Sequence, residues 1–265
     1  MNQPADKPTS DGPVVVASAD DLTVADVSRI ANEVLDEVEQ AVVGKRPALT
    51  IVMAAMLAGG HVLLEDFPGL AKTLLVETLG TVLGLDANRV QFTPDLMPSD
   101  VVGTYVYNMN EGQFRLRKGP IFTNLLLGDE INRAPAKTQS ALLEAMEEQQ
   151  VTIEGNRFEL PALFMVLATQ NPVEYEGTYP LPEAQMDRFA LKCSLGYVSI
   201  DEEVGILQAQ EQMHPLEKLK PVATLEDVLQ VRAAVRKVEV TEKLQEYVVR
   251  LVAATRSRQG VKLAA

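Results

Sequence analysis

Apolar residues follow two patterns along the chain: short continuous runs, and longer stretches with an apolar residue at every third or fourth position. The runs "HVLLE", "RVQF", "NLLLGDE", "ALFMVLATQNP" and "RFALKCSL" predict strands, because a parallel sheet covered on both faces buries successive side chains. Between them, "TLLVETLGTVLG" and "PAKTQSALLEAMEEQQ" predict helices. This alternation predicts an α/β fold in which helices cover both faces of a mainly parallel sheet.

Helical patterns flank this α/β region on both sides. Upstream, "RPALTIVMAAMLAGG" predicts a helix closed by Gly59 and Gly60. Residues 1–20 lack apolar residues at helical spacing, which predicts a mobile tail. From about Ser199 onward the pattern is helical throughout. We therefore expect a tail (1–20), an α/β domain (21–198) and a helical domain (199–265). The first helix is predicted from apolar residues at helical spacing: Val24, Val27, Ile30, Val34, Leu35, Val38 and Val42.

Two segments alternate around turn residues and predict β-hairpins. "GTYVYNMNEGQFRLRKG" should turn at Asn110 to Gly112, and "VTIEGNRFEL" at Gly155 and Asn156. The first hairpin carries the basic stretch "RLRKG". That stretch is either a solvated edge or a contact to an adjacent subunit or to substrate.

The overall charge limits the partners. The chain has 24 basic and 37 acidic residues and a formal charge of −13, which repels phosphate backbones, so no nucleic-acid partner is expected. No apolar run reaches the roughly 18 residues of a membrane span, and no signal peptide is recognised, so a cytoplasmic location is expected. Cys193 should be a small buried side chain rather than a reactive thiol, and the isolated His61 and His214 do not predict a zinc site.

The stretch "LLEDFPGLAKTLL" resembles a phosphate-binding loop between a strand and a helix, with Asp66 and Ala71 in place of two glycines. Main-chain N–H groups from Gly69 to Thr73 would wrap a β-phosphate, Lys72 would reach the β- and γ-phosphates, and Thr73 would bind Mg²⁺. Asp66 would be tolerated with a positive φ and its carboxylate turned away from the phosphates. The alternative is a strand–turn–helix connection that binds nothing.

Three further groups fall at strand ends or before a strand. Asp129 ends a buried run and could hold Mg²⁺ through water, and Glu130 could orient or deprotonate an attacking water; a solvated acidic pair is the alternative. Asn171 could bond the γ-phosphate or that water, although Asn before Pro also starts turns. Arg188 could offer its guanidinium to a neighbouring subunit's γ-phosphate, or pair with Asp187 at the surface.

The strings "LPEAQMDRF", "LLLGDEINRAP", "TQSALLEAMEEQQVTIEG" and "ATQNPVEYEGTYPLPEAQ" resemble the MoxR family of AAA+ ATPases, over about Val42 to Ser194. The resemblance implies a P-loop AAA+ core with a parallel five-stranded sheet, two hairpin insertions and a small helical lid. It also implies ATP binding and hydrolysis with Mg²⁺ in a ring, expected to be a hexamer, with a chaperone-like remodelling role. A partner with a von Willebrand factor A domain is implied as well.

The same resemblance assigns roles to individual residues. Asp66 departs from the family pattern, and its effect on nucleotide affinity stays open, whereas Ala71 agrees with the P-G-x-A-K-T loop of the family. The implied assignments are the Walker A loop (Pro68, Gly69, Leu70, Ala71, Lys72 and Thr73), Walker B (Asp129 and Glu130), sensor 1 (Asn171), the arginine finger (Arg188) and an adenine-contacting segment (Val43 and Gly44).

The resemblance further implies a lid arginine, sensor 2, in an S-P-R context after a segment like "RQGVKLAA". The sequence ends at Ala265 without that motif, so we expect a partial lid, weak ATPase activity, a mainly monomeric protein and a mobile region past about Glu239.

Two other functions are weighed against an ATP-driven remodelling motor. A nucleotide-dependent switch with little hydrolysis would not need Glu130, Asn171 and Arg188. A DNA-translocating motor is disfavoured by the charge of −13. The sequence does not identify the client protein.

Overall fold

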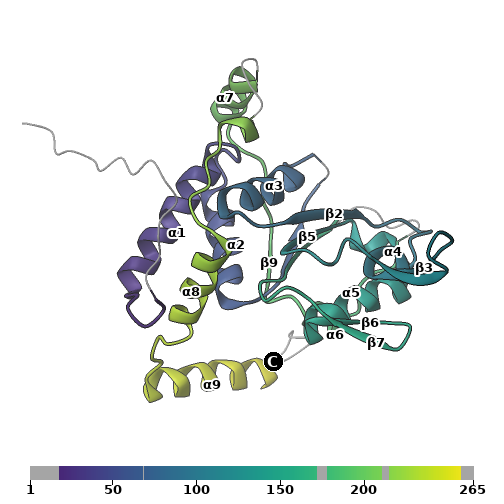
Figure 1. Ribbon diagram of the computed structural model, residues 1–265. Coiled ribbons are helices and arrows are strands. Elements are labelled where there is room, and N and C mark those ends of the chain that lie inside the picture. The colour runs from purple at the N-terminus through teal and green to yellow at the C-terminus, as the bar shows by residue number, and fades with distance from the viewer. Residues whose placement is uncertain (1–17, 68, 172–177, 211–214, 258–265) are drawn as a thin grey trace, which may run out of the picture.

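A five-stranded parallel sheet forms the centre of the protein (Figure 1). The computed structural model describes residues 18–67, 69–171, 178–210 and 215–257. The strand order is β2-β5-β8-β1-β9, and every pair of neighbours is parallel, as the sequence predicts. The strands are β1 (Val62–Glu65), β2 (Ala87–Gln91), β5 (Leu125–Asp129), β8 (Met165–Gln170) and β9 (Leu191–Cys193).

Helices cover both faces of this sheet. The helices of the described residues are α1 (Val24–Glu39), α2 (Arg46–Ala58), α3 (Lys72–Leu83), α4 (Pro98–Val102), η1 (Ile131–Arg133), α5 (Ala136–Glu148), α6 (Glu183–Met186), α7 (Ile200–Gln210), η2 (Pro215–Lys218), α8 (Leu225–Val235) and α9 (Glu242–Ser257). The helices α1, α2, α3 and α8 pack on one face, and α4 and α5 on the other. In Figure 1, α7 and α9 stand away from this body.

The continuous apolar runs are explained by the two covered faces. Leu64 and Leu127 pack with the α1, α2, α3 and α8 side, whereas Leu63 and Leu126 pack with the α4 and α5 side. All four side chains are buried. Because neighbouring residues of a strand point to opposite faces, both positions must be apolar here, and no alternation with polar residues appears.

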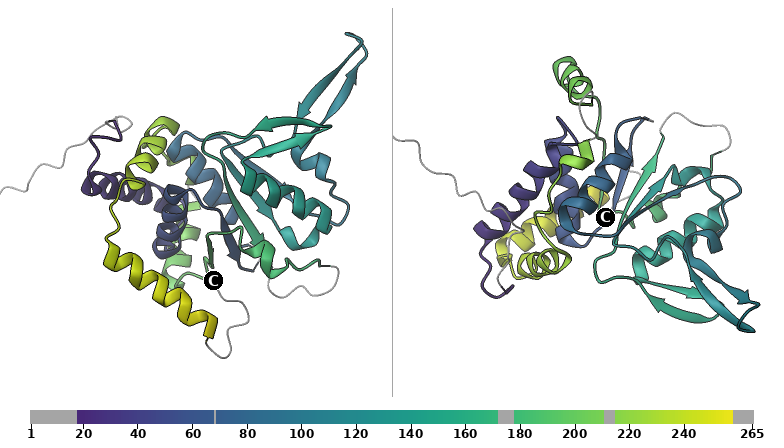
Figure 2. Two further views of the ribbon diagram at one scale, coloured as in Figure 1. Left: turned by 90° about the horizontal axis from the view of Figure 1, so that it is seen from below. Right: turned by 45° about the horizontal axis from the view of Figure 1, so that its top comes forward.

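Both predicted hairpins are present, as two separate two-stranded sheets. They consist of β3 (Gly103–Asn108) with β4 (Gln113–Lys118), and β6 (Gln150–Ile153) with β7 (Asn156–Glu159). The first projects from the body (Figure 2). The second turns one residue earlier than predicted, because Glu154 and Gly155 take the positive φ values of 48° and 84° that a two-residue turn of this type requires. Asn156 instead pairs with Ile153 in the ladder.

Two consecutive glycines end α2 and lead into β1. Gly59 caps the helix with φ 81°, as the sequence predicts. At Gly60 an added Cβ would lie 2.4 Å from the Cβ of Ala190, so only glycine allows this approach. The close contact brings the entry to β1 against the chain that enters β9.

The N-terminal end of the described chain contacts α8, whereas α9 at the C-terminal end leaves apolar side chains exposed. Ala19 donates its N–H to Gln230 of α8 at 2.9 Å, and Asp20 pairs with Lys237, so the last two residues of the predicted tail (1–20) contact α8 and the segment that follows it. Residues 1–17 lie outside the described part of the chain. On α9, Tyr247 and Val249 are exposed. Within the described ranges, no helix combines the length and apolar character needed to cross a bilayer.

His61 is a buried core residue at the start of β1. Its Nδ1 accepts the N–H of Val166 at 3.0 Å, and its Nε2 lies 3.2 Å from the carbonyl oxygen of Met146. This pair of contacts requires a neutral ring with the proton on Nε2. Burial, opposed by the bond to Met146 and aided by the charge of Arg232, lowers the pKa of His61 below its ordinary value of 6.5.

We therefore expect His61 to make the fold sensitive to acid. Below about pH 6.5 the unfolded chain takes up a proton that the folded chain resists, so stability falls as pH falls. The slope from this group is at most about 1.4 kcal/mol per pH unit. Urea unfolding of the parent and of His61→Gln at about pH 7.5 and about pH 5.5 measures it. The variant should lose less stability on acidification, and equal losses would contradict the assignment.

Candidate nucleotide-binding site

The phosphate loop joins β1 to the first turn of α3. Gly69 and Ala71 take φ values of 85° and 56°, a region that costs Ala more than Gly. The Lys72 ammonium donates to the main-chain oxygens of Asp66 at 3.2 Å and Phe67 at 3.0 Å. It is thereby held across the loop, beside a helix N-terminus whose N–H groups have no partner within the helix. This combination suits an anion.

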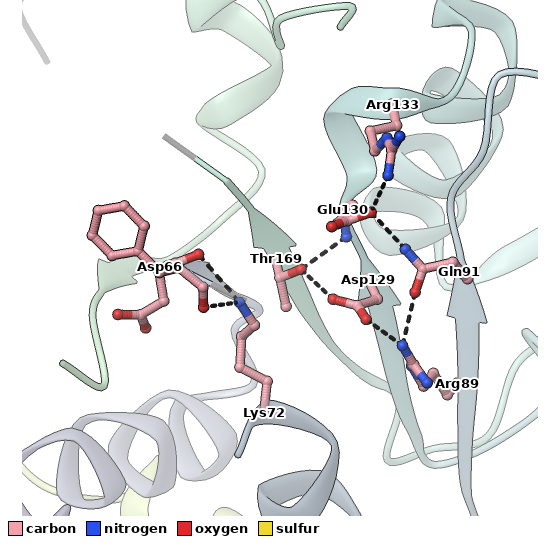
Figure 3. A network of polar contacts seen from close by, with 9 residues as sticks. Asp66, Lys72, Arg89, Gln91, Asp129, Glu130, Arg133 and Thr169 are labelled. Carbon is pink, nitrogen blue, oxygen red and sulfur yellow. Dashed lines mark hydrogen bonds and ion pairs between the residues drawn. The ribbon is translucent and has the colours of Figure 1, made fainter. Parts of the chain in front are cut away.

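The Asp66 carboxylate points away from this lysine. Figure 3 shows main-chain oxygens, and not the carboxylate, meeting the Lys72 amine. The carboxylate instead accepts hydrogen bonds from Ser194 Oγ (2.6 Å), Leu195 N (2.6 Å) and Gly196 N (3.1 Å), and the residue is 3% exposed. The expected orientation away from the phosphates is therefore found. The positive φ considered for Asp66 is wrong, since Gly69 and Ala71 make the turn.

A polar pocket of about 440 Å³ lies between the phosphate loop and the ends of β2 and β5. It brings Asp129 and Glu130 together with five predicted residues of the loop: Gly69, Leu70, Ala71, Lys72 and Thr73. The carboxyl ends of parallel strands meet at one edge of the sheet, which explains why segments far apart in sequence line one pocket. Pro68, also predicted for this loop, lies outside the described residues.

The two acids at the end of β5 are held by residues from the neighbouring strands (Figure 3). Asp129 Oδ1 accepts from Thr169 Oγ1 at 2.7 Å, and its Oδ2 pairs with Arg89 at 2.6 Å. The Thr169 hydroxyl also accepts the N–H of Glu130 at 2.8 Å. One threonine on β8 therefore positions both acids. Thr169 is fully buried, so these bonds are shielded from water.

Glu130 has an unusual backbone and two side-chain partners. Its φ and ψ are 56° and 51°, a left-handed conformation that is uncommon for residues other than glycine and is often found at functional sites. Its Oε2 accepts from Gln91 Nε2 at 2.7 Å and from Arg133 Nη1 at 2.9 Å. The carboxylate is therefore held at the wall of the pocket by β2 and η1.

The oxygen donors of the pocket fit a magnesium ion. The Thr73 hydroxyl and the Asp129 carboxylate are hard oxygen ligands of the kind that Mg²⁺ takes in small numbers, with the remaining positions filled by water and substrate phosphates. Across the described ranges, no group of three or more His, Cys, Asp or Glu side chains could form a larger metal cage. Arg89 now bonds the carboxylate that an ion would use.

A second pocket, of about 410 Å³, adjoins the first at the phosphate loop. Its walls are more apolar and include both Val43 and Leu70, which the family resemblance assigns to the nucleotide site. Gly44 has φ 71°, and an added Cβ would lie 2.6 Å from Glu202 Oε1. The residues lining the pocket are Gln40, Ala41, Val42, Val43, Lys45, Gly69, Leu70, Ala71, Leu74, Tyr197, Val198, Glu203, Ile206 and Pro215. An apolar and a polar pocket joined at an anion-binding loop match the two halves of a nucleotide.

Comparison with known proteins identifies relatives of this chain. The family model "ATPase family associated with various cellular activities (AAA)" matches residues 61–191. "Chaperone MoxR1" of Mycobacterium tuberculosis is 47% identical over 220 residues, covering 83% of this chain and 58% of that protein. "Uncharacterized protein YeaC" of Bacillus subtilis is 49% identical over 238 residues, covering 90% of this chain and 74% of the relative. The chain belongs to the MoxR family of AAA+ ATPases.

A solved structure supports the same conclusion for the fold. An inferred ATPase from Cytophaga hutchinsonii superposes with a TM-score of 0.80 at 48% identity, covering 86% of this chain and 69% of that one. The chain thus spans about three quarters of YeaC and 58% of MoxR1. The predicted fold class, an AAA+ α/β core with a helical C-terminal part, is confirmed.

Three predicted residues of this MoxR-family site, Gly44, Asn171 and Arg188, do not line either pocket. Asn171 follows β8 directly and is buried at the same edge of the sheet as Asp129. Arg188 pairs with Glu147 of α5 at 2.6 Å, and neither residue lines the two pockets described above. The roles assigned to Asn171 and Arg188 stay predictions.

Four residues of the site were missed from the sequence: Arg89, Gln91, Arg133 and Thr169. Arg89 and Gln91 alternate with buried Val90 on β2, so their side chains share one side of the strand. Their position beside β5 depends on the strand order and could not be read locally. Thr169 carried a weak signal, because it is a polar residue inside an otherwise apolar run.

We expect the Thr169 hydroxyl to stabilise the fold through the two acids. Thr169→Val keeps the shape but leaves the buried N–H of Glu130 without its acceptor, which should lower the free energy of unfolding by about 1–3 kcal/mol. Thr78→Val is the matched control, because Thr78 is also fully buried and its hydroxyl has no hydrogen-bond partner among the described residues. Urea unfolding should show no loss for the control, and equal losses would refute the role of Thr169.

Proposed function

We propose that this protein binds ATP with Mg²⁺ in the two joined pockets and hydrolyses it to remodel a partner protein. The observation that carries the proposal is the polar pocket that Lys72 and Thr73 of the phosphate loop line together with Asp129, the last residue of β5, and Glu130, which follows it. A loop that merely connected a strand to a helix would not need these two acids opposite it. The apolar pocket then takes the base, with Val43 and Leu70 on its wall.

The predicted residues that line the polar pocket have distinct roles in the proposed reaction. Lys72 and the N–H groups of the loop hold the β- and γ-phosphates. Thr73 and Asp129 would hold Mg²⁺, which when bound neutralises phosphate charge. Glu130 orients a water and accepts its proton. Gln91 and Arg133 both bond its Oε2, so the water would be bound by the other carboxylate oxygen, Oε1.

Arg188 is proposed to act on the site of a neighbouring copy. It lies outside the pockets of its own chain, and its partner Glu147 is a surface residue whose side chain is 48% exposed. Exposed ion pairs contribute at most about 1 kcal/mol, so the guanidinium can change partner at little cost. Asn171, buried at the end of β8, is proposed to bond the γ-phosphate or the attacking water.

The assembly and the client are proposals that rest on the family. Ring formation, expected as a hexamer, would bring Arg188 to a neighbouring pocket. A partner with a von Willebrand factor A domain and a cytoplasmic location stay predictions. A nucleotide-dependent switch with little hydrolysis is the second candidate, favoured by one observation: Glu130 is held by both Gln91 and Arg133.

Single substitutions in the pocket separate these two candidates. Glu130→Gln should bind Mg·ATP as the parent does but hydrolyse it about 10²- to 10⁴-fold more slowly, because the amide cannot accept a proton. Lys72→Ala should lose binding itself. Calorimetry and single-turnover hydrolysis measure the two effects. A Glu130→Gln variant that hydrolyses at the parent rate would remove Glu130 as the base, and a parent without turnover would favour the switch.

Mixed assemblies test the proposed role of Arg188. Arg188→Ala should still bind ATP but lose turnover, because the guanidinium stabilises charge that develops during transfer. Mixing it with Lys72→Ala, each inactive alone, should restore part of the activity at interfaces that join an intact pocket to an intact arginine. Arg29→Ala, on α1, serves as the control substitution of an exposed arginine, because its ion pair is with Glu33 of the same helix. No recovery in an oligomer proven to be mixed would argue against a shared site.

A further inference from the structure

The carboxylate of Asp66 holds a turn of the chain that is distant in sequence. Its three hydrogen bonds, from Ser194 Oγ and from the N–H groups of Leu195 and Gly196, all come from the three residues that follow β9. Gly196 has φ 64°, a left-handed backbone conformation that favours glycine and bends the chain locally, and we call the segment Ser194–Gly196 the turn after β9. A buried carboxylate with three donors is a stable arrangement, because each donor compensates part of the lost hydration.

A second charged residue holds the same turn from the other side. Lys45, which is 7% exposed, donates its ammonium to the carbonyl oxygen of Gly196 at 2.6 Å. Gly196 therefore has its N–H bonded to Asp66 and its carbonyl bonded to Lys45. The loop after β1 and the segment before α2 are thus both tied to one residue of the turn.

The residues that follow this turn form part of the apolar pocket. Tyr197 and Val198 line it together with Val43 and Leu70. The Tyr197 ring also lies 6.5 Å from the ring of Phe67, next to Asp66 in sequence. A shift of the turn would move Tyr197 and Val198 and change the width of the pocket.

The turn is also where the chain passes from the α/β body to the helical C-terminal part. α7 begins at Ile200, four residues after Gly196, and its Glu202 accepts the N–H of Ser199 at 2.8 Å. Glu202 also lies against Gly44, where an added Cβ would meet its carboxylate. The position of α7 therefore depends on the same turn that Asp66 holds.

We propose that Asp66 is a positioning residue for the base-binding half of the cleft, fixing the Ser194–Gly196 turn against the phosphate loop. The inference rests on the proposed ATP site. It explains why an acid can stand next to a phosphate site where the general loop pattern has glycine: the carboxylate faces the turn and not the ligand. Asp66 touches no reacting atom in this arrangement, and acts through Tyr197 and Val198.

A comparison of two ligands tests this role. Mg·ATP uses both halves of the cleft, whereas magnesium tripolyphosphate uses the phosphate half alone. In Asp66→Asn one donor of the turn faces the amide NH₂ group, which cannot accept its hydrogen bond. The dissociation constant for ATP should therefore rise about tenfold, which corresponds to the loss of one charge-assisted hydrogen bond. Binding of tripolyphosphate should change by less than about twofold, since Lys72 and the loop stay in place. Calorimetry measures both constants.

Glu65→Gln is the matched control. It removes the same charge one residue earlier, but the Glu65 carboxylate pairs with Lys192 of β9 at 2.8 Å and does not bond the turn, so both ligands should bind as in the parent. Ser194→Ala, which removes one of the three donors, should weaken ATP binding in the same direction by a smaller factor. Hydrogen exchange at Leu195 and Gly196 should become faster in Asp66→Asn, because their N–H groups bond that carboxylate.

Three outcomes would overturn the inference. If Asp66→Asn binds both ligands as the parent does, the carboxylate positions nothing. If the dissociation constants of Asp66→Asn for ATP and for tripolyphosphate rise by the same factor, Asp66 supports the phosphate loop as a whole and not the base-binding half of the cleft. If the parent binds tripolyphosphate but ATP no more tightly, the apolar pocket takes no base and the proposed function fails with the inference, independently of any Asp66 variant.

Discussion

The parallel register of β1, β5 and β8 is the constraint on which the site depends. The three strands are paired side by side, and their carboxyl ends therefore lie at one edge of the sheet. The phosphate loop leaves this edge from β1, the two acids from β5, and Thr169 and Asn171 from β8. The core on both faces holds this register, because a shift by one residue would turn buried leucines toward the wrong layer.

The charged groups of the cleft are satisfied by the chain itself. Lys72 bonds two main-chain oxygens, Asp129 bonds Arg89 and Glu130 bonds Arg133. A ligand with negative phosphates and a cation would have to replace these contacts, because the charges of the site already have partners. The free energy gained on binding is therefore smaller than the charges alone suggest. The arginines also give the site a way to respond to a ligand, since their side chains are partly exposed.

Asp66 shows how a departure from a motif can be accommodated. The general pattern places a glycine where the chain must pass close to a phosphate, yet here the turn is made by Gly69 and Ala71. The carboxylate is directed to the far side of the loop, where Ser194 and two N–H groups bind it. The negative charge of Asp66 also acts on the nearby Cys193. The pKa of this half-buried thiol is raised mainly by burial and in addition by the charge of Asp66. Cys193 is thus less reactive than an ordinary thiol.

The sequence alone determined the strands, most helices, the loop and the acids, because these follow from local periodicity and from residue types at short spacing. It also determined the family. Tertiary structure decided which side chains hold those groups. Arg89 bonds Asp129, which is 40 residues away in sequence, and Asp66 bonds Ser194, which is 128 residues away. The first contact depends on the pairing of β2 with β5 and the second on the pairing of β1 with β9, and no local pattern encodes this strand order. Contacts between segments so far apart depend on how the layers pack, and packing is a property of the whole chain.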